Sequence, residues 1–182
     1  MTLWVDQVDA LLVQPSSSLA AWLLHSKHIS KDLRKHCREL KVDLKGQHQM
    51  HAYVDEYDYL QVVNEVAWIR EIFLNGDNVP LTYGRVVVPA NTYQRYQHDF
   101  ENLGDKPIGE TLLYPNPLVT RSPFQYAYFS NQDPILQAIN QHLNLSEPLA
   151  QAFGRRSSFL LPEHCPLLIT EVFLPTLGDR VP

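Results

Sequence analysis

The chain has 182 residues, of which 45% are hydrophobic, and its 20 acidic and 15 basic residues give a net charge of −5. A chain of this length typically folds as one domain that buries about 70% of the surface exposed by its unfolded form. We therefore expect residues 1–182 to form a single domain that needs no disulfide or structural metal. The hydrophobic share excludes a disordered protein. The acidic balance argues against a nucleic-acid partner, which requires clustered basic charge.

The cysteines and the N-terminus indicate where the protein works. Cys37 and Cys165 lie far apart and form no CxxC motif, so we interpret them as reduced, partly buried thiols. The N-terminus has no basic segment, and Asp6 and Asp9 interrupt its first apolar stretch, unlike a signal peptide. No run approaches the ~20 apolar residues of a membrane helix. We therefore expect a cytoplasmic protein that does not insert into a membrane.

The N-terminal third of the chain predicts two helices and a polar turn. Ser16–Ser18 can cap a helix whose apolar face contains Leu19, Trp22 and Leu23. A second helical spacing spans 29–40, with Ile29, Leu33, Cys37 and Leu40 on one side and basic residues on the other. The acidic run Asp55–Asp58 predicts a solvated turn, because a calcium loop alternates its ligands around a central glycine.

The middle of the chain predicts a β-hairpin. Residues 66–74 alternate with the two-residue period of a strand and are mostly apolar on both faces. Residues 75–78 are Asn-Gly-Asp-Asn, which favours a turn. A second β-rich stretch follows through Val86–Val88. The two strands should therefore lie in a sheet that is covered on both sides.

The C-terminal half predicts two more helices and a strand. A helical spacing over 93–103 should end near Gly104. Asp133-Pro134 begins another helix, whose buried residues are Ile135, Leu136, Ile139 and Leu143. A strand is expected over 167–174, before Pro175. The predicted fold is α+β, a single domain with a central, mainly antiparallel sheet flanked by helices and enclosing an internal ligand pocket.

Several common chemistries have no support in the sequence. The chain has only seven glycines and lacks both GxGxxG and P-loop motifs, which argues against nucleotide cofactors. It also lacks the GxSxG motif of serine nucleophiles. Five histidines show short spacings in polar stretches without a closing CxxC or HExxH, so we interpret them as surface residues and not as metal ligands, namely His25, His28, His36, His48 and His51.

Two charged residues interrupt apolar strands and are the main candidates for function. Arg70 shares a predicted face with Trp68 and Ile72, and Glu171 shares one with Ile169 and Phe173. Glu71 points the opposite way from Arg70, so it is not the partner that a buried guanidinium requires. The pattern allows a mutual salt bridge or edge positions open to solvent. It equally allows a pocket in which Arg70 anchors a substrate carboxylate and Glu171 handles a hydroxyl or a proton.

Three sequence blocks resemble the bacterial chorismate pyruvate-lyases, which make 4-hydroxybenzoate for ubiquinone. The blocks occur in the family's order and read WIREIFLNGDNVPLTYGRVVVP at 68–89, LGDKPIGETLL at 103–113, and GRRSSFLL followed by CPLLITEVFLP within 154–175. The resemblance implies elimination of pyruvate from chorismate without a cofactor or metal, by a protein expected to be a monomer. The segment 122–153 is longer than the family leads us to expect, which predicts a lid extension or a surface insert.

The resemblance also implies roles for individual residues. Arg70 would hold the ring carboxylate and Glu171 would face the ring hydroxyl, as catalytic and substrate-binding residues. Ile108 would line the pocket with its backbone available to the ligand, and Ile29 aligns with a further pocket position. Arg85 would be a second basic group at or near the opening of the site, where it could bind the side-chain carboxylate.

The sequence leaves the mechanism and two other functions open. Either Glu171 or the departing enolpyruvyl group could accept the ring proton. A related lyase would give 3-hydroxybenzoate and hold the ring differently. The fold also resembles small-molecule-sensing domains of bacterial transcription regulators, although the residues before 66 leave no room for a DNA-binding domain with a basic recognition helix.

Overall fold

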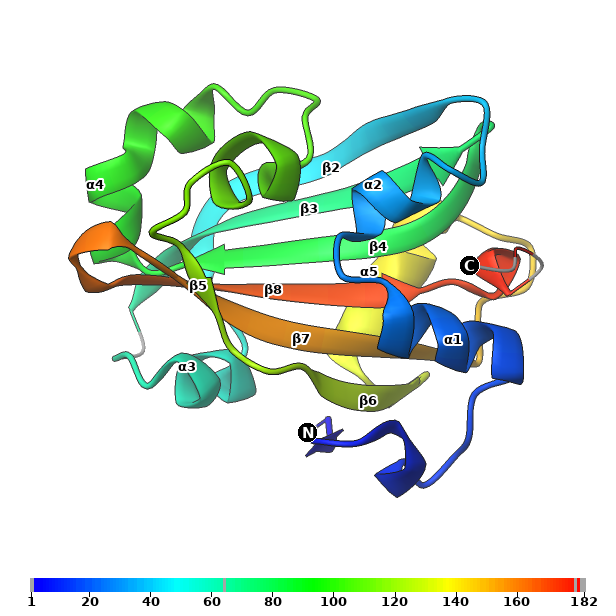
Figure 1. Ribbon diagram of the computed structural model, residues 1–182. Helices are drawn as coiled ribbons and strands as arrows, with labels where there is room; N and C mark the ends of the chain where they lie inside the picture. The colour runs from blue at the N-terminus through cyan, green and yellow to red at the C-terminus, as the bar shows by residue number, and fades with distance from the viewer. Residues whose placement is uncertain (1, 64, 179, 181–182) are drawn as a thin grey trace.

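The computed structural model of the chain describes residues 2–63, 65–178 and 180, which form one antiparallel sheet with helices on both faces (Figure 1). The strand order is β1-β6-β7-β8-β4-β3-β2, and β5 pairs with β7 outside this path. The strands are β1 Trp4–Val5, β2 Leu40–His51, β3 Val66–Gly76, β4 Val79–Val88, β5 Thr120–Arg121, β6 Gln125–Ser130, β7 Gln151–Leu161 and β8 Cys165–Phe173. The predicted α+β class and antiparallel sheet are confirmed.

The predicted hairpin is present as β3 and β4. Its connection is the pair Asp77-Asn78, and both residues have positive φ values of 54° and 66°. Two left-handed residues in succession match the tight turn that suits the right-handed twist of paired strands. The Asp77 carboxylate also accepts hydrogen bonds from the backbone amides of Arg38 and Glu39, at 2.8 and 3.1 Å. This contact fixes the start of β2 beside the hairpin.

One face of the sheet, the cavity face, carries the side chains of Arg70, Ile72, Val86 and Glu171, since these residues lie in register across β3, β4 and β8. Helices α1 Ser17–His25, α2 Ile29–Leu33 and α4 Ala90–Glu101 cover it, together with the π-helical turn η2 Gly109–Leu113 (Figure 1). Helix α1 begins as predicted, because the Ser16 hydroxyl accepts a hydrogen bond from the Leu19 amide at 3.3 Å.

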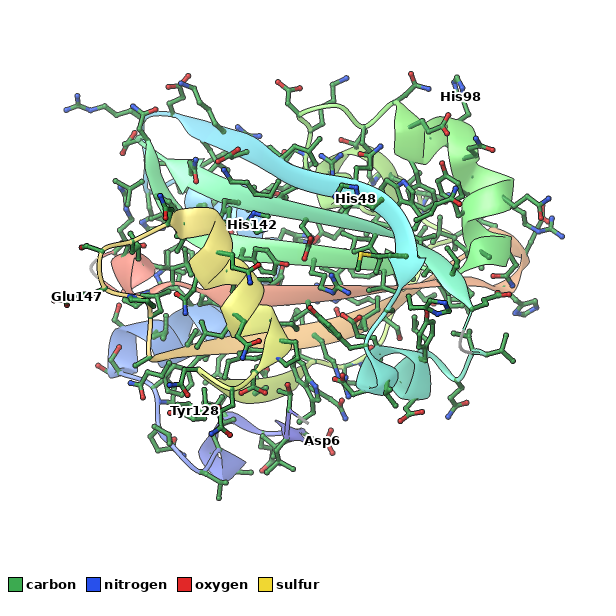
Figure 2. All side chains as sticks on the ribbon, turned by 180° about the vertical axis from the view of Figure 1, so that it is seen from behind. Asp6, His48, His98, Tyr128, His142 and Glu147 are labelled. Atoms are coloured by element: carbon green, nitrogen blue, oxygen red, sulfur yellow. The ribbon has the colours of Figure 1, made fainter. Side chains whose placement is uncertain are left out.

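The opposite face is covered by α3 Val54–Leu60 and α5 Pro134–Leu143 (Figure 2). Helix α5 has Pro134 in its first turn and buries Ile135, Leu136 and Ile139 against the sheet, as predicted. The 122–153 segment is not a lid over the predicted site, because its helix α5 lies across the sheet from the cavity face. It contains the core strand β6 as well, so it is not a surface insert either.

Two predictions for the N-terminal third are wrong. The helix expected over 29–40 ends at Leu33, and Leu40 begins β2. The helical spacing does not continue beyond Leu33, because residues 34–39 form turns and bends and Leu40 pairs with Gly76 in the sheet. The acidic run 55–58 lies within helix α3 and is not a solvated turn. Glu56 is only 2% exposed there, because it pairs with Arg85.

The helix predicted over 93–103 and the strand predicted over 167–174 are present as α4 and β8. Helix α4 ends at Glu101, and Gly104, three residues later, has a positive φ of 54°. Cys37 is half-buried, Cys165 is buried, and both are free thiols. No helix in the described part of the chain is long and apolar enough to cross a membrane.

Candidate active site

A narrow cavity of about 50 Å³ lies between the cavity face of the sheet and the segments that cover it. Its floor comes from β3, β4 and β8, and its roof from α2 and the 107–114 segment. Most of the wall is apolar, with Ile72, Val86 and Ile169 on the floor. Glu171 is the one ionisable carboxylate among the described lining residues. A carboxylate on an apolar wall is a candidate for contact with a polar group of a ligand.

Glu171 reaches the cavity from the C-terminal part of β8. Its neighbours across the sheet are Gly84 on β4 and Arg155 on β7. Because Gly84 has no side chain, the space beside the carboxylate stays open, and a Cβ atom there would approach Ile72 to 3.3 Å. The Oε2 atom of Glu171 accepts a hydrogen bond from Nε of Arg155 at 2.6 Å. The other carboxylate oxygen is therefore the one available to a ligand.

Arg70 lies on the same face of the sheet but is not among the described residues that line the cavity. Its side chain is 1% exposed and donates to Oε1 of Gln47 at 3.0 Å. Its Nη2 atom donates to the carbonyl oxygens of Gly104 and Lys106, at 2.8 and 3.3 Å. Burial lowers the pKa of Arg70, and the negative charge of Asp105 opposes this effect. Arg70 thus holds the loop that leads directly into the roof of the cavity.

Arg70 and Glu171 do not pair with each other. Each has its own partners, Gln47 and loop carbonyls for Arg70 and Arg155 for Glu171. The mutual salt bridge that the sequence pattern allowed is therefore not formed. Neither residue lies on an edge strand, since β3 and β8 are both internal to the sheet. Glu71 points to the opposite face, as expected, where it accepts hydrogen bonds from Tyr83 and Arg85.

Two further residues that were predicted to line the pocket, Ile29 and Ile108, lie in the roof of the cavity. Ile29 begins α2, Ile108 immediately precedes the π-helical turn, and both line the cavity. Tyr114 closes this turn and packs edge-on against His28, with ring centroids 4.0 Å apart. Burial raises the pKa of Tyr114, and the charge of Glu171 raises it further. The structure thus brings Ile29, Ile108 and Glu171 together around one space.

The prediction of surface histidines is wrong for His36, which is half-buried against Trp22, and for His28. His28 has the more unusual surroundings. It is half-buried, and its Nδ1 atom is buried without a hydrogen-bond partner among the described residues. Burial lowers its pKa, and the nearby positive charge of Arg121 adds to this effect. His25, His48 and His51 are exposed. No group of three or more His, Cys, Asp or Glu side chains in the described ranges could hold a metal ion.

Arg85 does not reach the cavity, so the prediction that it lies at the opening of the site is wrong. Its guanidinium is 2% exposed on the opposite face and donates twice to Glu56, at 2.8 and 3.1 Å, and once to Glu71, at 3.0 Å. Burial works to lower the pKa of Arg85, but the charge of Glu56 outweighs it and the net shift is upward. Arg85 therefore ties helix α3 to the sheet.

A β-bulge places Arg85 on that face. The turn pairs Gly76 with Val79 and Asn75 with Pro80, but the next pair is Leu74 with Thr82, so Leu81 is an extra residue in β4. An uninterrupted hairpin would pair Arg70 with Arg85 on one face. The bulge shifts the register by one residue, and a shift of one residue moves every later side chain to the other face.

Arg155 contacts Glu171 directly and was not among the site residues predicted from the sequence. The residue lies in the middle of β7, is 0% exposed, and donates through Nη1 to the carbonyl oxygens of Leu23 and Ser26, at 2.9 and 2.6 Å. It therefore links Glu171 to the segment between α1 and α2. Two adjacent arginines in the GRRSSFLL block were the available signal, but β7 was not recognised as a strand because its polar residues obscure the apolar alternation.

The comparison with protein families shows which family the chain belongs to. A sequence model of the family described as chorismate lyase matches residues 2–182. The chain belongs to the chorismate lyase family. A probable chorismate pyruvate-lyase from Pseudoalteromonas atlantica is 32% identical over 166 residues, which cover 88% of this chain and 81% of the relative. A probable chorismate pyruvate-lyase from Shewanella amazonensis is 30% identical over 97% of this chain and 88% of its own length.

Solved structures with a fold similar to that of this chorismate lyase family member come from transcription regulators. The ligand-binding domain of a GntR-family regulator from Bordetella bronchiseptica has a TM-score of 0.53 at 11% identity, over 75% of this chain and 83% of that one. PhnF from Mycobacterium smegmatis has a TM-score of 0.55 at 13% identity, over 94% of this chain and 68% of that one. At such identities the likeness shows the fold alone.

Proposed function

We propose that this chain is a chorismate pyruvate-lyase, which eliminates pyruvate from chorismate and releases 4-hydroxybenzoate without a cofactor. Membership of the chorismate lyase family supports the reaction class. The observation that carries the assignment to a site is Glu171, a carboxylate on the wall of an apolar cavity whose Oε1 atom is not used by the hydrogen bond from Arg155. We further propose that the protein is cytoplasmic and that it acts as a monomer, the state that its family resemblance implies.

Chorismate carries a ring carboxylate at C1, an enolpyruvyl ether at C3 and a hydroxyl at C4. In the proposed complex the ring lies against the apolar floor, the C1 carboxylate accepts hydrogen bonds from the Arg70 guanidinium and the Ile108 amide, and the C4 hydroxyl donates to Glu171. Arg70 suits this role because a guanidinium recognises a planar carboxylate through two parallel bonds. Its present contacts with Gly104 and Lys106 place it next to the roof.

The elimination needs orientation and charge stabilisation more than added reagents. The C3–O bond breaks and its electron pair leaves with the enolpyruvyl oxygen, while the C4–H bond supplies the electrons that complete the aromatic ring. The C4 proton passes either to Glu171 or to the enolpyruvyl group, and the released enolpyruvate becomes pyruvate. Both routes rely on a fixed arrangement of the substrate in a site without bulk water.

The cavity has to widen when it binds its ligand. Its volume of about 50 Å³ is well below the roughly 150 Å³ that holds a benzene ring in a protein interior. The floor is fixed by strand pairing, whereas the roof consists of the short helix α2 and the 107–114 segment. We therefore expect the roof to move when the substrate enters.

Product analysis tests the proposal directly. The purified protein is incubated with chorismate, pyruvate is measured with lactate dehydrogenase, and the aromatic product is identified by chromatography and NMR. We expect equal amounts of pyruvate and 4-hydroxybenzoate. A hydroxyl at ring position 3 would instead identify a 3-hydroxybenzoate lyase. Binding of an aromatic acid without any turnover would favour a sensing domain, the alternative that the shared fold supports.

A further inference from the structure

Arg155 carries a buried hydrogen-bond donor that nothing in the described part of the chain satisfies. Its side chain is 0% exposed; Nε donates to Glu171, and Nη1 donates to two backbone carbonyls. The remaining nitrogen, Nη2, is buried and has no hydrogen-bond partner among the described residues. Native proteins leave few buried donors unpaired, and a charged group without a partner is especially costly to bury. The free donor therefore indicates a place for a polar ligand atom.

The surroundings of the guanidinium limit where that atom can lie. The ring centroids of Phe124 and Phe173 lie 4.1 and 5.2 Å from the guanidinium carbon, so aromatic rings pack against the group. In an arginine, Nη2 lies on the same edge of the guanidinium as the Nε–H bond. Here that edge faces Glu171, which lines the cavity. A ligand oxygen that reaches Nη2 must therefore lie beside the Glu171 carboxylate.

We propose that Nη2 of Arg155 donates to the enolpyruvyl carboxylate of chorismate, so that Arg155 is the second carboxylate-binding residue of the site. This inference rests on the proposed function. Chorismate is a dianion, and Arg85, the other candidate for its second carboxylate, lies on the opposite face of the sheet. The C3 and C4 atoms of the ring are bonded to each other. A ring whose C4 hydroxyl meets Glu171 therefore places its C3 substituent next to the same carboxylate, where Nη2 is free.

This contact gives Arg155 two functions in one elimination. Through Nε it positions the Glu171 carboxylate that faces the C4 hydroxyl. Through Nη2 it holds the enolpyruvyl group, on which negative charge develops as the C3–O bond breaks. A preorganised cation in a buried site stabilises such charge more than water does. The product 4-hydroxybenzoate lacks the enolpyruvyl carboxylate, so its binding uses the first function and not the second.

The variant Arg155→Lys separates these functions, because one ammonium group can still pair with Glu171 but cannot also reach a second carboxylate. We expect kcat/KM for chorismate to fall about 10- to 100-fold, while the Kd of 4-hydroxybenzoate changes less than about threefold. Equal losses for chorismate and 4-hydroxybenzoate would show that Arg155 acts only through Glu171. Unchanged kinetics would show that Nη2 does not contact the substrate. Either result overturns the proposal.

The adjacent residue provides a matched control. Arg156 is also a buried arginine of β7, but it lies on the opposite face between the rings of Trp4 and Tyr59, each 4.2 Å from its guanidinium carbon. Arg156→Lys should leave both kcat/KM and the product Kd at their original values in the folded protein. A loss in Arg156→Lys equal to that in Arg155→Lys would assign the effect to the strand and not to the contact, and would overturn the proposal.

A measurement on the unaltered protein covers the case in which Arg155→Lys fails to fold. Two probes are compared. The first, 3-(carboxymethoxy)-4-hydroxybenzoate, carries a second carboxylate beside the hydroxyl, and the second, 3-methoxy-4-hydroxybenzoate, carries a neutral methoxy group at the same position. We expect calorimetry to show at least about tenfold tighter binding of the first compound. Equal or weaker binding would contradict the Arg155 contact. Turnover of chorismate by the same sample tests the proposed function separately, so the two failures are distinguishable.

Discussion

Replacing Arg85 with methionine tests whether this residue stabilises the fold or serves the site. The buried guanidinium makes three charge-assisted hydrogen bonds, to Glu56 and Glu71, and its carbon lies 4.4 Å from the ring centroid of Tyr53. Removing one partner of a buried ion pair costs about 3–5 kcal/mol, because the remaining charges lose their compensation. At roughly 2–4 °C per kcal/mol for a chain of this size, the Tm should fall by about 6–20 °C.

Thermal and urea unfolding monitored by tryptophan fluorescence measure this loss, and chorismate kinetics at low temperature measure the site. We expect the KM of the folded Arg85→Met protein to stay within about twofold of the original value, because the cavity face is untouched. The double variant Arg85→Met with Glu56→Gln should recover part of the lost stability, since it removes one of the uncompensated charges. A Tm within about 2 °C of the original together with a tenfold higher KM would refute the structural role assigned here.

Three other measurements address the site. Arg70→Ala should weaken binding of both chorismate and 4-hydroxybenzoate by about 10- to 100-fold; unchanged calorimetric affinities would remove Arg70 from the site. Glu171→Gln should keep the cavity shape and lower kcat at least about 100-fold if the residue transfers a proton; near-normal turnover would assign the proton to the enolpyruvyl group. His28 has a lowered pKa in the folded state, so the unfolded chain binds more protons as the pH drops through about 6.5. The stability that neutral His28 provides is therefore present above that pH and lost below it, and His28→Phe should show a smaller fall in Tm between pH 8 and pH 5.

The sequence predicted those elements in which local chemistry and the fold agree. The turn residues Asp77-Asn78 and the two-residue period of 66–74 identify the β3–β4 hairpin, and Asp133-Pro134 marks the start of α5. Strand β7 was missed because its middle reads Gly-Arg-Arg-Ser-Ser, in which buried polar side chains replace the apolar alternation. Strand β2 was missed because its edge position keeps polar residues in contact with water.

The sequence by itself determined that Arg70 and Glu171 are charges inside apolar strands, because strand periodicity alone places them among buried neighbours. It also contained the blocks that identify the family. Only the tertiary structure decided the partners of these charges. Glu171 meets Arg155 because β8 pairs with β7, a contact between residues 16 positions apart that depends on strand register. Arg85 faces away from the cavity because one extra residue, Leu81, shifts the register of β4. Both outcomes depend on strand register, because a shift of one residue would change the face of every side chain, and side-chain chemistry near Arg85 or Glu171 does not encode that register.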